Sequence, residues 1–247
     1  MSTTSTESMT LCGREITYRV RRSKRAKRVR IRANLKGITV VLPHRASVDP
    51  AVILQRKASW VQKHLDKFAR LRDRLPVRTF EPGAVFPLLG RDRTVRVEPC
   101  DQSHVSGDTL LDGDSLVLCR DRVQATSVHA ELEHLYRETA RAHYADRAQH
   151  FGSVMGLTYD RLQIRNQKTR WGSYSPRTGT LSMNYRLLMA PPAIVDYVIV
   201  HELAHVLHAN HSAKFWRVVE RYDPTYREKE RWLDEHGPTL IFDGRHV

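Results

Sequence analysis

The sequence predicts an α+β fold, with a basic strand-rich part followed by a helix-rich part, and three observations support this prediction. Short runs that alternate polar with apolar residues fill the first 122 residues, as in half-buried β-strands. Residues 123–150 instead carry apolar side chains at helical spacing. A further apolar run begins at Ala193 and leads into His201-Glu-Leu-Ala-His205. We therefore expect a mobile polar tail at 1–10, a basic β-rich module at 11–122 and an α+β domain at 123–247.

The strands of the basic module are bounded by turn residues, and one of them is strongly basic. Nine of the fourteen residues from Arg19 to Arg32 are Lys or Arg. Within this run Arg28-Val-Arg-Ile-Arg-Ala33 alternates strictly, which places arginines on one strand face and apolar residues on the other. A helix capped by Ser47 is expected after the third strand. The strands expected here are Arg14–Arg22, Lys27–Ala33, Gly37–Leu42, Val85–Leu89, Thr94–Val97, Thr109–Leu111 and Leu116–Cys119.

One long helix, one strand and one buried helix are expected in the second part. The helix at 123–150 has a single apolar stripe, made of Val128, Leu132, Leu135 and Tyr136. Residues Thr180–Arg186 alternate small or polar with apolar side chains after a turn-like segment, which predicts a strand. Pro191-Pro192 then breaks the chain. The apolar residues that follow predict a buried helix, which would hold His201 rigidly.

Composition favours an intracellular protein. At 247 residues the chain can bury a sizeable core. Cys12, Cys100 and Cys119 are odd in number and lack metal-ligand spacing, so we expect no disulfide framework and a reducing compartment. The polar N-terminus has no apolar signal core, and no segment approaches the roughly 20 apolar residues that span a bilayer. We therefore expect a cytoplasmic protein without a membrane partner.

The formal net charge is +14, and two interpretations of it stay open. The basic strand face would attract polyanions such as nucleic acid or nucleotides, because phosphate contacts release condensed counterions. Alternatively it is a solvated sheet face in an arginine-rich protein, since charge alone is no recognition code. Aromatic residues are not interleaved with the basic ones, which disfavours a platform for stacked single-stranded bases.

The segment from His201 to His211 combines a metal site with a general base. His201 and His205 are four residues apart, so on a helix they lie on one face and can share an ion. Glu202 lies about 100° round the helix, where it can hold the water that the metal polarises. A third protein ligand leaves one position open for that water, as in catalytic zinc sites.

His211 is the preferred third ligand, and rivals remain. Asn210 can take the left-handed conformation that turns the chain, and Ser212 can cap a helix that starts near Ala213. His211 would then lie in the bend between two helices. Alternatively a glutamate on a following helix completes the site. The candidates for that role are Glu220, Glu228 and Glu230.

Four motifs in residues 163–235 resemble the YgjP-like metal-dependent hydrolases, which are relatives of the SprT-like and WLM zinc peptidase domains. They are Asn166-Gln-Lys-Thr-Arg-Trp-Gly-Ser173, Asn184-Tyr-Arg-Leu-Leu-Met-Ala-Pro-Pro192, His201-Glu-Leu-Ala-His205 and Asn210-His-Ser-Ala-Lys-Phe-Trp216. The resemblance implies a zincin-like domain in which the three histidines bind the metal and Glu202 is catalytic. Members of this family often carry a cysteine where this chain has Tyr174, so no thiol acts at that position here.

These observations predict a zinc-dependent metallopeptidase that acts on peptides or proteins. Glu202 would be its general base. Arg170, Tyr185 and His208 are candidates for contacts to the substrate or its oxyanion, and the strand Thr180–Arg186 is a candidate edge for an extended peptide. Hydrolysis of a nucleotide phosphoanhydride is an alternative, although no Gly-rich phosphate loop is present. A DNA-associated protein with a non-catalytic zinc site is a second alternative.

Overall fold

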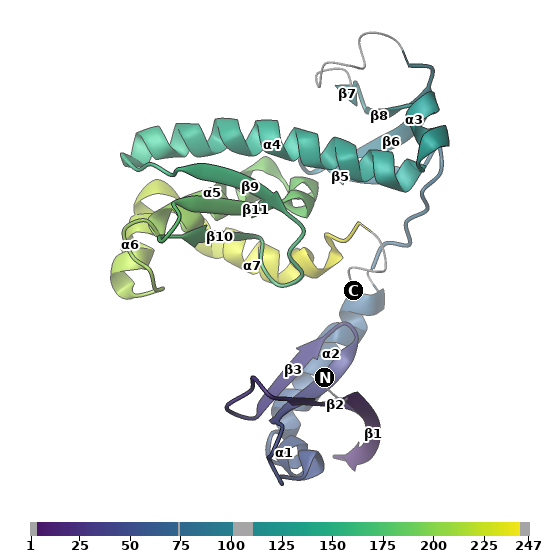
Figure 1. Ribbon diagram of the computed structural model, residues 1–247, viewed down its shortest axis with the longest axis vertical. Helices are drawn as coiled ribbons and strands as arrows, with labels where there is room; N and C mark the ends of the chain where they lie inside the picture. Colours follow the sequence, from purple (N-terminus) through teal and green to yellow (C-terminus); the bar gives the residue numbers. More distant parts are fainter. Residues whose placement is uncertain (1–3, 74, 101–110, 243–247) are drawn as a thin grey trace. The chain divides into compact units, whose positions relative to one another are not determined.

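The computed structural model describes residues 4–73, 75–100 and 111–242, and it divides the chain into two compact units, Met1–Pro76 and Val77–His246 (Figure 1). The sequence placed this division at 122/123. The difference arises because the strands between residues 85 and 119 bury Phe86, Leu88 and Leu116 in the same core as the later helices. Local periodicity does not reveal which core a strand joins.

The first unit is a four-stranded sheet with two helices. Its strands pair in the order β1-β2-β4-β3. Residues 4–10, expected to be a mobile tail, instead belong to β1 and pair antiparallel with β2. Leu11 and Met9 pack on the core of the unit, which explains why this segment joins the sheet. The elements are β1 (Thr4–Leu11), β2 (Arg14–Ser23), β3 (Arg30–Asn34), β4 (Gly37–Pro43), α1 (Pro50–Arg56) and α2 (Ala58–Asp73).

One face of this sheet is apolar and packs against the helices. Its core joins strand residues such as Tyr18 and Val40 to Leu54 of α1 and Val61 of α2. The predicted alternation is confirmed in β3, where exposed Arg30 and Arg32 flank a residue that packs on the core. The helix begins later than predicted, because Asp49 rather than Ser47 caps it, accepting a 2.8 Å hydrogen bond from the Ala51 amide.

The second unit opens with another four-stranded sheet, paired in the order β5-β6-β8-β7. Most of the strand expected at Thr109–Leu111 lies outside the described residues. The predicted helix at 123–150 is two helices, because Ser127 caps α4 after a break. Gly156, at φ 65°, ends α4. The elements are β5 (Val85–Leu88), β6 (Arg91–Glu98), β7 (Leu111–Asp112), β8 (Ser115–Cys119), α3 (Arg120–Ala125) and α4 (Val128–Met155).

Cys100 and Cys119 form a disulfide. This bond contradicts the expectation of no disulfide framework. The parallel pairing of β6 with β8 sets Glu98 beside Cys119, and Cys100 lies two residues beyond that point. Cys12, in the first unit, is a free, exposed thiol. Sequence spacing missed the bond because strand pairing, and not separation along the chain, brings the two sulfurs together.

A three-stranded sheet and three helices complete the second unit, with α4 lying along the sheet (Figure 1). The strands pair in the order β10-β11-β9. The strand predicted at Thr180–Arg186 ends at Asn184 and is central, so both its edges are occupied and β10 is an edge strand instead. The elements are β9 (Arg161–Arg165), β10 (Gly172–Ser175), β11 (Thr180–Asn184), the 3-10 helix η2 (Tyr185–Met189), α5 (Pro192–Ala204), α6 (Ala213–Tyr222), α7 (Tyr226–His236) and the 3-10 turn η3 (Gly237–Thr239).

Within the described residues, none of the helices has both the length and the apolar character needed to cross a bilayer.

Candidate metal centre

Helix α5 carries His201 and Glu202, and most of its residues are buried against the rest of the second unit. It begins at Pro192, as the sequence predicted, and buries nine of its thirteen residues. Its outward-facing Asp196 accepts two hydrogen bonds from Arg147 of α4, at 2.7 and 2.9 Å. Burial together with this half-buried ion pair fixes α5 against α4. His201 lies in the last turn of α5 and His205 directly follows its end.

The fold brings the ring nitrogens of His201, His205 and His211 within 4.8 Å of one another. The Nε2 atoms of His201 and His211 are 3.0 Å apart, a separation that suits two donors on one ion. His211 lies in the segment between α5 and α6, and Ser212 caps α6 at Ala213 as predicted. Asn210 does not adopt the expected left-handed conformation. The chain turns instead through successive hydrogen-bonded turns after Ala204.

Aromatic side chains of α6 support the histidine cluster. The ring centroid of Phe215 lies 4.9, 4.6 and 4.8 Å from those of His201, His205 and His211. Trp216 stacks on His211 with centroids 5.7 Å apart. Phe215 is fully buried, so it restrains the three imidazoles from one side. Rings packed in this way keep few alternative orientations.

Local interactions favour neutral imidazoles with a free lone pair. The Nδ1 atom of His205 is 2.9 Å from the carbonyl of His208. Donation through Nδ1 leaves the Nε2 lone pair for a metal. Burial lowers the pKa of His201 to about 3, helped by the neighbouring His205 and His211, and burial also lowers the pKa of His205. Three imidazoles are a donor set that suits zinc and similar transition metals better than calcium or magnesium.

Glu202 is buried beside β10. Only 7% of its surface is exposed, and the backbone N–H of Tyr174 donates a hydrogen bond to its carboxylate. Burial raises the pKa of Glu202 to about 7, against the opposing effects of that hydrogen bond and of Arg170. A metal cation at the adjacent histidines would favour the carboxylate form.

Gly172 makes room for this carboxylate. A Cβ atom at position 172 would lie 2.6 Å from Cγ and 2.8 Å from Oε1 of Glu202. A side chain there would therefore displace the glutamate. No local sequence pattern singles out Gly172, although it lies in the Trp-Gly-Ser motif, because the close approach depends on how β10 packs on α5.

The three candidate contact residues have different surroundings. Arg170 is exposed and close enough to Glu202 to lower its pKa. Tyr185 is fully buried, with Phe242 against its ring and the guanidinium of Arg137 4.5 Å above it. It belongs to the core, so its prediction as a substrate contact is corrected. His208 is half-buried, and its described contact to the site is its carbonyl.

Two buried residues anchor the loop that carries Arg170. The amide of Asn184 donates hydrogen bonds to the carbonyls of Gln167 and Arg170, at 2.7 and 3.2 Å. Arg186 donates to the Gln167 carbonyl and to the Leu240 carbonyl. Both residues belong to the motif Asn184–Pro192. Their role follows from contacts across the fold that no local pattern encodes.

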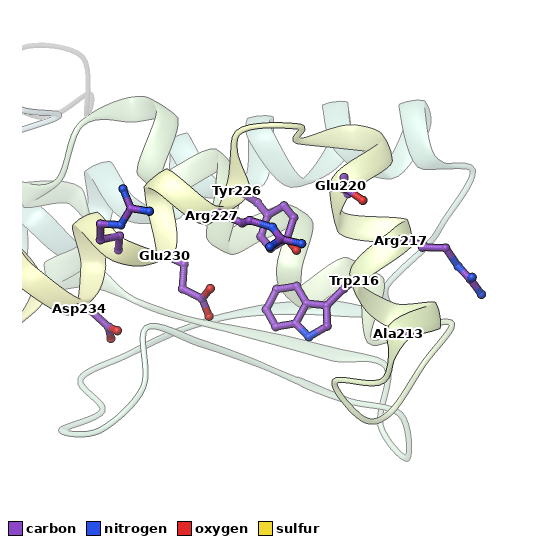
Figure 2. Close-up of a pocket in the computed structure, with 9 residues that line it drawn as sticks. Ala213, Trp216, Arg217, Glu220, Tyr226, Arg227, Glu230 and Asp234 are labelled. Carbon is purple, nitrogen blue, oxygen red and sulfur yellow. The ribbon is translucent and has the colours of Figure 1, made fainter.

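The rival glutamate ligands lie outside the histidine cluster. Among the described residues, the group at this position that could hold a metal ion contains the three histidines and no carboxylate. Glu220 and Glu230 instead line a groove of about 790 Å³ between α6 and α7, where Trp216 faces Tyr226 (Figure 2). Trp216 thus separates this groove from His211. The groove residues are Ala213, Trp216, Arg217, Glu220, Tyr226, Arg227, Glu230, Arg231 and Asp234.

The chain matches the family described as YgjP-like, metallopeptidase domain, over residues 27–236. No curated protein matches it. Among solved structures it is similar to the metallopeptidase zymogen abylysin of Pyrococcus abyssi, with 25% identity and a TM-score of 0.36 over 40% of this chain and 99% of that one. It is also similar to the zymogen jannalysin of Methanocaldococcus jannaschii, with 22% identity and a TM-score of 0.34 over 37% and 94%. At these TM-scores neither likeness adds to the family match.

Proposed function

Because the chain belongs to the YgjP-like metallopeptidase domain family, we propose that it is a zinc-dependent endopeptidase with Glu202 as its general base. Family membership supports a metal-dependent peptidase. The observation that carries the finer proposal is the convergence of three histidine nitrogens within 4.8 Å, with the buried carboxylate of Glu202 on the adjacent helix position. A peptidase of this type needs both parts.

The residues present fit a catalytic zinc site. Three protein donors leave one coordination position for water or substrate, whereas a structural zinc site uses four. The Nε2 atom of His201 faces the Nε2 atom of His211, whereas the buried Nδ1 atom of His201 has no hydrogen-bond partner. When bound, zinc would polarise the attacked carbonyl and lower the pKa of its water towards ~7.

Glu202 would move the proton in the reaction. Its carboxylate accepts the proton of the attacking water and then passes it to the leaving amine. The Tyr174 amide holds the carboxylate in place, and Gly172 keeps the space that it occupies. Arg170 is our candidate for stabilising the negative charge on the attacked oxygen, because its positive charge acts at Glu202 and its side chain is open to solvent.

The edge strand β10 would align the substrate. It pairs with β11 on one side and adjoins Glu202 through Tyr174. An extended peptide that adds to this edge gains main-chain hydrogen bonds and presents a peptide bond near the histidines. This arrangement replaces the predicted edge at Thr180–Arg186 and favours unfolded or extended polypeptides as substrates.

Glu202→Gln tests the proposal. The substitution retains size but removes the base, so zinc should stay bound at the parent stoichiometry while peptide turnover falls at least ~100-fold. Metal content is measured by elemental analysis and turnover on an unfolded protein. Glu228→Gln, on the exposed surface of α7, is the matched control and should retain parent activity.

Three outcomes would contradict the proposal. Equal peptide turnover in parent and Glu202→Gln would exclude the glutamate as base and point to a contaminating protease. Glu202-dependent turnover of nucleoside triphosphates, without turnover of peptides, would support phosphoanhydride hydrolysis instead. A parent protein that binds no zinc would remove the basis of both reactions.

A further inference from the structure

The net positive charge of this protein comes from its first unit. Residues 1–76 contain 19 Lys and Arg against 5 Asp and Glu, whereas residues 77–247 contain 22 of each. The formal net charge of +14 therefore belongs to the first unit alone, and the unit with the metal centre is formally neutral. A diffuse solubility charge would be spread over both units. This segregation directs attention to the surface of the first sheet.

Strand register gathers four arginines on one face of that sheet. Arg19 of β2 and Arg32 of β3 both pair with Thr39 of β4. In the next row, Arg21 and Arg30 both pair with Val41. Arginines are thus about 7 Å apart along each strand and about 10 Å apart across the sheet. We name this set, Arg19, Arg21, Arg30 and Arg32, the arginine face.

The arginine face lies opposite the side that packs on the helices. Even-numbered residues of β2, such as Tyr18 and Val20, enter the core, so the odd-numbered arginines point the other way. Strand β1 extends the face with exposed hydroxyls, because Thr6 pairs with Arg19 and Thr4 with Arg21. Arginine, threonine and serine are among the side chains that commonly contact phosphate groups.

Three of the five carboxylates of the first unit are engaged away from the arginine face, whereas Glu15 of β2 lies on the same side of the sheet as Arg19, four residues before it. Asp66 pairs with Arg14, Glu7 accepts from the Tyr18 hydroxyl, and Asp49 caps α1. None of the four arginines makes an ion pair with a described residue, and Arg21 Nε has no hydrogen-bond partner. Four like charges on neighbouring strands repel one another. An external anion would relieve that repulsion.

We propose that the arginine face binds the phosphodiester backbone of double-stranded nucleic acid without sequence preference. The arginines form two rows across the sheet. A duplex fits this arrangement because its two strands offer rows of negatively charged phosphates. No aromatic side chain occupies the described positions of this face, so it lacks the stacking surface that single-strand binders use. Basic residues of the segment between β2 and β3, at Lys24, Arg25, Lys27 and Arg28, are exposed and continue the positive surface.

Salt dependence measures the number of phosphate contacts. For duplex DNA the slope of log K against log salt is about −0.9 per contact, so four arginines predict a slope of about −3.6 or steeper. Removing one row with Arg19→Gln and Arg32→Gln should flatten the slope by about 1.8 and weaken binding at low salt at least ~10-fold. Two duplexes of unrelated sequence should bind the full-length protein equally well.

A charge-matched control separates this surface from the general charge of the unit. Lys63→Gln with Lys67→Gln removes the same charge from α2, the helix that covers the opposite side of the sheet. This variant should keep the parent slope within the error of the titration. The double substitution Arg19→Lys with Arg32→Lys retains the positive charge. It should keep most of the parent slope of log K against log salt, even if the variant with two glutamines folds poorly.

Three outcomes would overturn the proposal. A slope of log K against log salt near zero for the parent protein would by itself exclude phosphate contacts. Equal weakening by the α2 control would assign binding to diffuse charge. Tighter binding to single strands, or to vesicles of phosphatidylserine and phosphatidylcholine, than to the duplex would assign the face to another polyanion. None of these measurements depends on peptidase activity.

Discussion

At the scale of single residues, the candidate site combines the buried carboxylate of Glu202 with a glycine that leaves room for it. Glu202 occupies a buried space beside β10 that exists because position 172 is glycine. The conformation of Gly172 does not require glycine, since its φ is not in the left-handed region. Close approach to the Glu202 carboxylate is therefore the physical reason for glycine at this position.

Gly172→Ala should lower peptide turnover while metal binding persists. The added Cβ would meet Glu202 at 2.6–2.8 Å, and a shift of about 1 Å in a reacting group can cost ~100-fold in rate. Steady-state kinetics with zinc analysis would measure both effects. Ser173→Ala, on the opposite face of the same strand, should stay close to the parent. Unchanged turnover in Gly172→Ala would argue that the carboxylate acts from elsewhere.

His211→Ala should weaken zinc binding at least ~100-fold, because loss of a ligand costs more than the 10–100-fold expected for loss of a supporting hydrogen bond. Competition with a chelator of known affinity would measure the change. Glu228→Ala and Glu230→Ala should bind zinc like the parent. Loss of zinc in a glutamate variant but not in His211→Ala would transfer the third-ligand assignment.

At the scale of elements, the second unit joins distant strands through backbone pairing and covalent bonding. Strands β6 and β8 are parallel neighbours, and the Cys100–Cys119 disulfide closes the chain between them with a separation of 19 residues. Strand β8 packs its apolar residues in the core that includes α4 and α5. The disulfide thus restrains a strand that helps to hold the helices of the metal centre.

Reduction of this disulfide should lower the free energy of unfolding of the second unit by about 3 kcal/mol, the chain-entropy value for a loop of this size. Denaturant titration with and without a thiol reductant would measure the difference. Cys12→Ser should leave the effect intact, since Cys12 is free and in the other unit. The same stability under both conditions would indicate that the bond contributes nothing to folding.

At the scale of the whole molecule, two hydrophobic cores share no residue. One centres on Tyr18, Val40 and Leu54 in the first unit. The other includes Tyr144, Leu187 and Ile199 in the second unit. Charge is divided in the same way, because the first unit is strongly basic and the second is formally neutral. Each unit therefore has its own source of stability.

Calorimetry should resolve two unfolding transitions, and zinc should raise only one of them. A ligand that binds one native unit stabilises that unit by about 2.7 kcal/mol at 100 times its Kd. The zinc-sensitive transition should belong to Val77–His246, and His211→Ala should abolish the shift. A single transition that moves as a whole with zinc would show that the two units unfold together.

Features that depend on neighbouring residues along the chain could be predicted from the amino-acid sequence. Helical spacing predicted His201 and Glu202 on one helix, and both lie in the last turn of α5, with His205 directly after its end. Ser212 caps the next helix at its predicted place. The exposed arginines of β3 follow from strict alternation. These predictions succeed because helix and strand periods are local properties of the backbone.

Contacts between segments far apart in the sequence became visible in the tertiary structure alone. This structure set the division at 76/77, made β10 rather than β11 an edge strand, paired Cys100 with Cys119 and buried Tyr185. It also placed Gly172 against a glutamate thirty residues later and aligned arginines of two strands across β4. Such contacts depend on strand order and core packing between remote residues, which local periodicity does not encode.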